Sequence, residues 1–178
     1  MSNIVILVGS VRRDGNTQAL AEALAAGAGE RHQVELCSVA DYAVWPCTGC
    51  NCCFTQEGNR CVQQDDMQKL YPKLAAADVL VIASPVYFYG VSAQLKAVID
   101  RLHTPMRDRF PVKKLALLLV AGATLPTVFD AIERQYQLVL DYFQLEDAGR
   151  VLVRGVREIG DMQGHPALEE AYRLGQSL

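Results

Sequence analysis

Hydrophobic residues gather in three short runs along the chain. The runs are "IVILV" at 4–8, "VLVIA" at 79–83 and "LALLLVA" at 115–121, and Gly or Pro follows each within two residues. Each run is too short for a core helix and is rich in branched side chains, which is typical of strands buried on both faces. The pattern therefore predicts three central strands of a parallel sheet.

Two further runs alternate less cleanly because charged residues interrupt them. They are "QVELCSV" at 33–39, which contains Glu35, and "GRVLVRGV" at 149–156, which contains Arg150 and Arg154. A strand with a polar, partly exposed face belongs at the edge of a sheet. The chain thus provides two edge strands for the three central ones.

Helical periodicity fills the segments between these runs. The spacing predicts a helix over 18–28, with Asn16 and Thr17 as its caps, and another that opens at Asp65 or Asp66 and ends near residue 77. Pro72 predicts a kink or a late start in the second. A last short helix is expected near residue 166. Two more helices are marked by apolar residues at helical spacing, the first by Val91, Leu95, Val98, Ile99 and Leu102, and the second by Val128, Ile132, Val139, Leu140 and Phe143.

Five strands that alternate with five helices predict one α/β domain over residues 1–178. Its architecture is expected to be a three-layer, doubly wound parallel sheet. With the first, third and fourth strands central, the strand order is 2-1-3-4-5, the flavodoxin-like arrangement. Ligands in such sheets bind outside the carboxyl ends of the strands, near the switch point between the first and third.

Composition and charge argue against nucleic acid and membranes as partners of the chain. The chain has 178 residues, 51% of them hydrophobic, and a formal net charge of -3, so it has no basic field to attract nucleic acid. No run approaches the ~20 apolar residues of a membrane span. The first residues, "MSNIVILVGSVRRDG", lack the pattern of a signal peptide, so we expect a cytoplasmic protein whose thiols stay reduced.

The loop after the first strand, "GSVRRDGNT" at 9–17, combines two glycines with small polar residues before a helix. Backbone N–H groups, hydroxyls and a helix N-terminus form a natural seat for a phosphate. The loop is not a Walker motif, because Asn16 stands where Lys is required, and it lacks the dinucleotide pattern G-x-G-x-x-G. A mononucleotide phosphate fits better, and an ordinary polar turn is the alternative.

The loop after the third strand, "SPVYFYG" at 84–90, places three aromatic residues at the mouth of the expected cleft. Aromatic side chains there suit a flat ring that lies against them. A hydrophobic patch closed by a neighbouring loop or subunit is the alternative. After the fourth strand, "AGATLPT" at 121–127 offers a small-residue turn that a ligand could approach.

Four motifs in this order carry a family resemblance: "GSVRRDGNT", "PCTGCNCC...C...DDM", "ADVLVIASPVYFYGVSAQLKAVIDR" and "VAGAT". Together they resemble the NADPH-dependent FMN reductase family of the flavodoxin-like superfamily, and within it the iron-sulfur flavoproteins and their cysteine-bearing relatives. The likeness runs from about residue 3 to residue 125 and is weak beyond Thr124.

The resemblance implies bound FMN, with NAD(P)H as the electron donor, in a homodimer or homotetramer whose flavin sites lie at subunit boundaries. Lys96, Asp100 and Arg101 match the family's "LK...IDR" helix, where an ion-paired helix face is a better interpretation than catalysis. Hydride transfer to a flavin demands no side-chain acid or base, so no catalytic residue is predicted. By resemblance, the phosphate is held by Ser10, Arg12, Asn16 and Thr17, and the ring is flanked by Pro85, Val86, Tyr87, Phe88 and Gly90.

Five of the six cysteines lie within "PCTGCNCCFTQEGNRC" at 46–61. Without Cys52, the spacing is C-x2-C-x2-C-x7-C, a usual way to hold a 4Fe-4S cluster, and the iron-sulfur flavoproteins carry this kind of pattern. The ligands would be Cys47, Cys50, Cys53 and Cys61. Zinc is a second possibility and a loop without metal is a third. Cys37, inside a strand, is expected to be a small core residue.

The sequence thus supports an FMN-dependent NAD(P)H oxidoreductase that reduces a small acceptor (a flavin, a quinone or a metal ion) by ping-pong hydride transfer. With no second domain to hold the nicotinamide nucleotide, one site would serve donor and acceptor in turn. The alternative is an electron carrier that relays single electrons between FMN, a 4Fe-4S cluster and ferredoxin-like partners. A regulatory module that uses the same fold without turnover is a further alternative.

Overall fold

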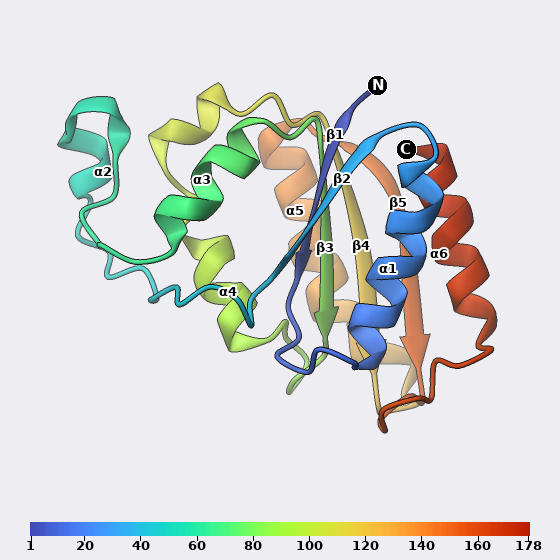
Figure 1. Ribbon diagram of the computed structural model, residues 1–178. Helices are drawn as coiled ribbons and strands as arrows, with labels where there is room; N and C mark the ends of the chain where they lie inside the picture. The colour runs from blue at the N-terminus through green and yellow to red at the C-terminus, as the bar shows by residue number, and fades with distance from the viewer.

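The computed structural model describes residues 1–178 and contains one five-stranded sheet in which every neighbouring pair is parallel. The strand order is β2-β1-β3-β4-β5, as the hydrophobic pattern predicts. All five strands end at the same edge of the sheet, at the bottom of Figure 1. The strands are β1 (Asn3–Val8), β2 (Gln33–Ser38), β3 (Val79–Pro85), β4 (Lys114–Ala121) and β5 (Glu146–Arg154).

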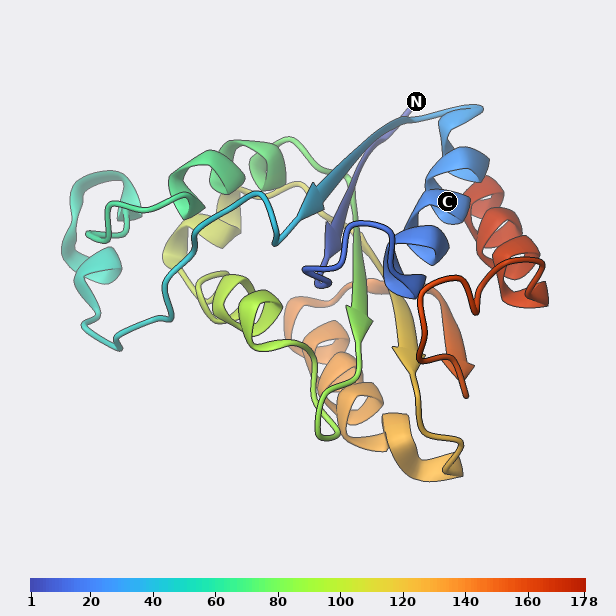
Figure 2. The ribbon, with the colours of Figure 1, turned by 60° about the horizontal axis from the view of Figure 1, so that its bottom comes forward.

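Helices cover both faces of the sheet and give three layers (Figures 1 and 2). On one face α1 (Asn16–Gly29) packs against α6 (Pro166–Ser177). The other face carries α3 (Met67–Ala75), α4 (Ala93–Asp100) and α5 (Asp130–Phe143). The connections contain the short helix α2 (Cys52–Thr55) and the 3-10 turns η1 (Glu57–Asn59), η2 (Pro105–Arg109) and η3 (Pro126–Phe129).

Alternate residues of the central strands build the two core layers. Ile4 and Ile6 of β1 face α1 and α6, whereas Val5 and Leu7, which alternate with them, face α3 and α4. Because both faces are covered, the central strands are apolar at nearly every position. The edge strand β2 is less buried: on one face Cys37 is buried, but Glu35, two residues earlier on the same face, is exposed. The prediction that Cys37 is a core residue is confirmed.

Several element ends differ from the predicted ones. Asn16 and Thr17 lie in the first turn of α1, and Gly15 is its N-cap, so the expectation that the first two cap the helix was wrong. Both polar side chains are buried in the loop cluster before the helix, which overrides their usual preference for the cap. Helix α3 runs through Pro72 after Asp66 as its N-cap.

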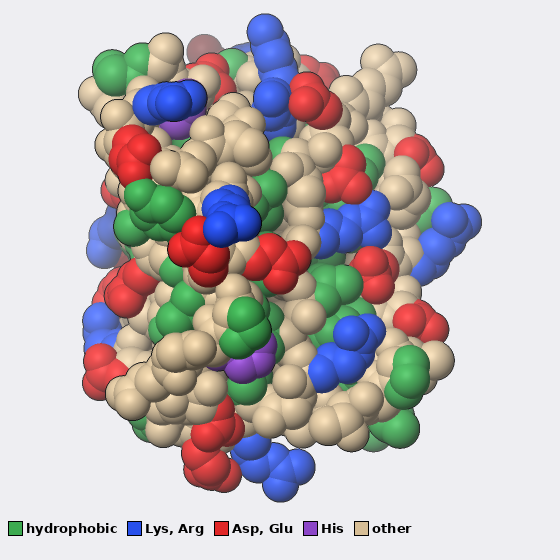
Figure 3. Space-filling view, turned by 90° about the vertical axis from the view of Figure 1, so that its right-hand side faces the viewer, with side chains coloured by type: hydrophobic (Ala, Val, Ile, Leu, Met, Phe, Trp, Pro, Cys, Tyr) green, Lys and Arg blue, Asp and Glu red, His purple; other side chains and the backbone are tan.

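The sheet also extends past the hydrophobic runs. Pro85 still pairs with Val120, and Glu146 opens β5 opposite Lys114. Acidic and basic side chains are interspersed on the side of the molecule that carries α1 and α6 (Figure 3), which agrees with the small net charge. None of the helices combines the length and the apolar character that crossing a bilayer requires.

Candidate cofactor-binding site

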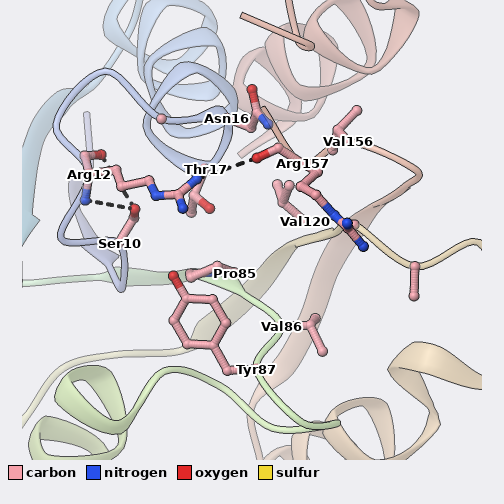
Figure 4. A pocket seen from close by; sticks show the side chains of 13 residues that line it. Ser10, Arg12, Asn16, Thr17, Pro85, Val86, Tyr87, Val120, Val156 and Arg157 are labelled. Atoms are coloured by element: carbon pink, nitrogen blue, oxygen red, sulfur yellow. Dashed lines mark hydrogen bonds between the residues drawn. The ribbon is translucent and has the colours of Figure 1, made fainter. Parts of the chain in front are cut away.

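A cavity of about 300 Å³ opens at the carboxyl ends of β1, β3 and β4, beside the switch point of the strand order (Figure 4). Polar groups from the loop after β1 form one side of it, and apolar side chains form the other. It contains no carboxylate. The lining residues are Ser10, Arg12, Gly15, Asn16, Thr17, Pro85, Val86, Tyr87, Val120, Gly122, Ala123, Val156 and Arg157.

The loop after β1 presents hydroxyls and a helix N-terminus to this cavity. Ser10 and Thr17 are almost fully buried, and the Ser10 Oγ accepts from the Arg12 N–H at 3.1 Å. No side chain caps the first turn of α1, and that turn holds no acidic residue. The positive end of the helix dipole therefore faces the cavity without a protein anion to neutralise it, as in sites that bind phosphate.

Asn16 is held in place by one half of its amide only. Its Nδ2 donates to the backbone oxygen of Glu158 at 2.9 Å, whereas its buried Oδ1 has no hydrogen-bond partner in the protein. An unsatisfied buried acceptor costs about 1–3 kcal/mol, so such atoms usually meet a donor from a ligand or from water. A ligand with hydroxyl groups beside its phosphate would satisfy this atom.

The loop after β3 forms a tight turn of aromatic residues. Tyr87 and Gly90 exchange backbone hydrogen bonds of 2.9 and 3.1 Å, and the two residues between them have positive φ: 48° at Phe88 and 64° at Tyr89. Such a conformation is unusual for non-glycine residues and often marks a functional site. Tyr87 lines the cavity, but Phe88 is 99% exposed at the tip of the turn, and neither it nor Gly90 reaches the lining.

The structure thus brings seven of the nine predicted cofactor residues to one cavity. It also adds residues that the sequence reasoning did not name. Gly122 and Ala123 lie in the turn after β4, which the sequence predicts as a ligand-accessible turn, but Val156 and Arg157 follow β5, which the sequence predicts only as an edge strand. Because parallel strands end at one edge, the segment after β5 was a candidate from its position alone.

This arrangement fits FMN. Two arginines, two hydroxyls and a helix N-terminus suit a phosphate dianion, and the apolar side formed by Pro85, Val86 and Val120 suits a flat ring beside Tyr87. Arg13 points elsewhere: it forms an exposed ion pair with Asp41 at 2.6 Å.

The cysteine segment leaves the sheet at the same edge but forms a separate lobe around α2 (Figure 1). Cys47 and Cys50 are exposed, Cys52, Cys53 and Cys61 are half-buried, and all are free thiols. In this conformation no three His, Cys, Asp or Glu side chains gather as metal ligands do. The four predicted ligands therefore do not form a cluster site here. The backbone N–H of Cys52 and the hydroxyl of Thr48 lower the pKa of Cys50.

A buried ion pair anchors this segment to the domain. Arg101, which follows α4, pairs with Asp65, and both side chains are only 1% exposed. The Arg101 guanidinium also donates to the backbone oxygen of Trp45 at 3.3 Å, so it joins the two ends of the cysteine segment. Lys96 and Asp100 form the ion-paired helix face that we expected. Arg101 does not belong to this exposed face, because its side chain is buried in the ion pair with Asp65.

Comparisons with known proteins agree with the geometry. The sequence model of the NADPH-dependent FMN reductase family matches residues 2–149. An iron-sulfur flavoprotein of Methanocaldococcus jannaschii is 41% identical over 123 residues, which are 68% of this chain and 62% of the relative. An iron-sulfur flavoprotein of Archaeoglobus fulgidus is 35% identical over 97% of this chain and 76% of its own length.

Among solved structures, the NAD(P)H:quinone oxidoreductase from Methanothermobacter marburgensis superposes with a TM-score of 0.77. The match covers 98% of this chain and 96% of that one at 19% identity, which supports the fold alone.

Proposed function

Because the chain belongs to the NADPH-dependent FMN reductase family, we propose that it is an FMN-dependent oxidoreductase that takes hydride from NAD(P)H and passes it to a small acceptor such as a flavin, a quinone or a metal ion. One observation carries the proposal: the cavity joins an uncapped helix N-terminus and two hydroxyls to an apolar side at the switch point of the sheet. Hydride chemistry would come from the bound FMN.

The chain's own residues bind and orient. Ser10, Thr17 and the first turn of α1 would hold the phosphate, and Arg12 would add a charge to it. Pro85, Val86 and the ring of Tyr87 would fix the plane of the flavin and exclude water from one side of it. The other side would stay open, so donor and acceptor would use one site in turn, in a ping-pong sequence.

A direct test is to titrate the purified chain with FMN and then mix the complex anaerobically with NADH or NADPH. We expect one FMN per chain, loss of the visible absorbance band of oxidised flavin with at least one of the two donors, and parallel lines in double-reciprocal plots against a quinone. Thr17→Val should weaken FMN binding about tenfold, whereas Thr55→Val, in the cysteine segment, should not. Failure of the wild-type chain to bind FMN would contradict the proposal.

A second candidate is an iron-sulfur flavoprotein that relays single electrons to ferredoxin-like partners. It is supported by the names of the relatives and by the spacing of Cys47, Cys50, Cys53 and Cys61. The described conformation does not gather these thiols. Iron and labile-sulfide assays on anaerobically purified protein decide: about four irons per chain would favour the relay, and flavin alone would favour the reductase.

We also propose that the chain forms a homodimer or homotetramer. Phe88 stands fully exposed beside the cavity, and an apolar groove of about 740 Å³ runs along α5. Exposed aromatic and aliphatic side chains of this kind commonly mark contacts between subunits.

A further inference from the structure

Arg157 belongs to the segment 155–161 after β5, which lies outside the part of the chain that the family model matches. This segment is tightly held. The backbone N–H groups of Arg157 and Glu158 both donate to the Asp161 carboxylate, at 2.7 and 2.8 Å, and these bonds lower the pKa of Asp161. The turn therefore has a defined shape of its own.

The same turn is joined to the loop after β1. The Glu158 carbonyl accepts from the Asn16 amide at 2.9 Å. The Arg157 carbonyl accepts from the Arg12 guanidinium at 3.4 Å, as Figure 4 shows. Two segments that are about 140 residues apart in sequence thus form one rim of the cavity. The position of Arg157 relative to the cavity is set by the same residues that are proposed to hold the cofactor.

The Arg157 side chain has no partner on the protein. Its guanidinium makes neither a hydrogen bond nor an ion pair, whereas Arg154, three residues earlier, donates to two backbone oxygens, lies over the Phe129 ring and does not line the cavity. The side chain of Arg157 lies flat against Gly122, where an added Cβ would meet its Nε at 3.2 Å. The glycine leaves room for the arginine along the cavity.

The residues that line the cavity carry positive charge and no negative charge. Arg12 and Arg157 are the ionisable cations of the lining, they lie along the same rim of the cavity (Figure 4), and no acidic residue lines it. Two guanidinium groups with no acidic neighbour in the lining give the cavity a positive potential, which favours an anionic ligand. A flavin nucleotide carries a phosphate dianion and, when reduced, a ring that bears negative charge. Either group would complete the pairing.

We propose that Arg157 is a second cofactor-binding arginine, which pairs with an anionic group of the bound flavin nucleotide. This inference rests on the proposed function, because it assumes that the cavity holds FMN. It assigns a role in the cofactor site to the segment after β5, and so to a part of the chain beyond the family match.

The test compares Arg157→Gln and Arg157→Lys with the control Arg13→Gln, which removes the same charge from the exposed pair with Asp41 outside the cavity. Three quantities are measured for each: the Kd for oxidised FMN, the Kd for riboflavin, which lacks the phosphate, and the midpoint potential of bound FMN. Thermal unfolding without flavin checks that the variants fold like the wild type.

If Arg157 pairs with the phosphate, Arg157→Gln weakens FMN binding about tenfold or more and leaves riboflavin binding unchanged. If it pairs with the reduced ring, oxidised FMN binds as before, and a tenfold loss of preference for reduced FMN lowers the potential by about 30 mV. In either case Arg157→Lys keeps part of the effect, because it keeps the charge.

Two results would overturn the inference. One is that Arg157→Gln behaves like Arg13→Gln in all three measurements. The other is an equal loss of FMN and riboflavin affinity with an unchanged potential, which would mean that the side chain only packs. Failure of the proposed function is distinct from both, since the wild-type chain itself would then not bind FMN.

Discussion

The thiol of Cys37 lies in the core beside β1 and is only 2% exposed. Burial, with a smaller contribution from the charge of Glu35, raises its pKa to about 11 from an ordinary value near 9. In the unfolded chain the thiol ionises near pH 9, whereas the folded chain keeps its proton until about pH 11. The unfolded state therefore binds fewer protons in this window, and stability falls as the pH rises.

We predict that this thiol alone removes about 2–3 kcal/mol of the free energy of unfolding between pH 9 and pH 11. Urea unfolding at several pH values measures the slope. Cys37→Ala is the control, because it lacks the ionisation but is still exposed to the titration of lysines and tyrosines. Parallel pH profiles for the wild type and Cys37→Ala would contradict the prediction.

The sequence predicts which residues come together at the cavity well where they belong to a contiguous loop. Ser10 and Thr17 could be identified because small polar residues before a helix suit a phosphate. For Arg157, topology indicates the segment but not the residue, because the place of Arg157 at the cavity depends on Asn16 and Arg12, which contact its segment from the far end of the chain. No local pattern in the sequence encodes such a contact.

Among the elements, α1 and α6 approach most closely at two glycines. A Cβ added to Gly175 of α6 would lie 2.2 Å from the Leu24 backbone oxygen of α1, and one added to Gly27 would lie 2.0 Å from the Tyr172 oxygen. Neither backbone oxygen can move away without shifting its helix. The outer layer of this face is therefore closed by backbone contact as well as by side chains.

We predict that Gly175→Ala lowers the free energy of unfolding by about 1–3 kcal/mol, since overpacking forces the two helices apart. Gly29→Ala is the matched control: it lies in α1 with nothing within 4 Å of the new Cβ, and it should stabilise by about 0.4–1 kcal/mol. Chemical denaturation of both variants measures the difference. Equal effects of the two substitutions would show that the helix contact does not resist the methyl group.

The elements themselves were predictable because each strand is hydrophobic in proportion to its burial. The runs at 4–8 and 115–121 lie within β1 and β4, and Glu35 correctly marks β2 as an edge. The ends of elements were less predictable. The pairing of Pro85 with Val120 and of Glu146 with Lys114 extends strands beyond their apolar cores, and register between distant strands cannot be read from composition.

On the scale of the whole molecule, one apolar groove on the outer surface has no covering element. This groove lies beside α4 and α5 and is lined by Ile99, Leu102, Leu138, Val139, Tyr142 and Phe143, together with the polar residues Asp100, His103, Gln135 and Asp141. Leu138 is 51% and Tyr142 61% exposed, whereas the outer face of α1 and α6 intersperses charges (Figure 3). A second copy of the chain would bury this groove and remove an apolar surface from water.

We predict that the wild-type chain has at least twice the 19.6 kDa mass of one chain in solution, and that Leu138→Glu shifts it toward that single-chain mass. A carboxylate in the centre of an apolar contact loses its hydration without gaining a partner, which costs more than most interfaces can offset. Light scattering after size-exclusion chromatography measures both masses, and Val62→Glu, also at an exposed apolar residue but outside the groove, should keep the wild-type mass. A wild-type chain that is monomeric at every concentration would contradict the predicted oligomer. A Leu138→Glu variant of unchanged mass would show that the subunits do not meet at this groove.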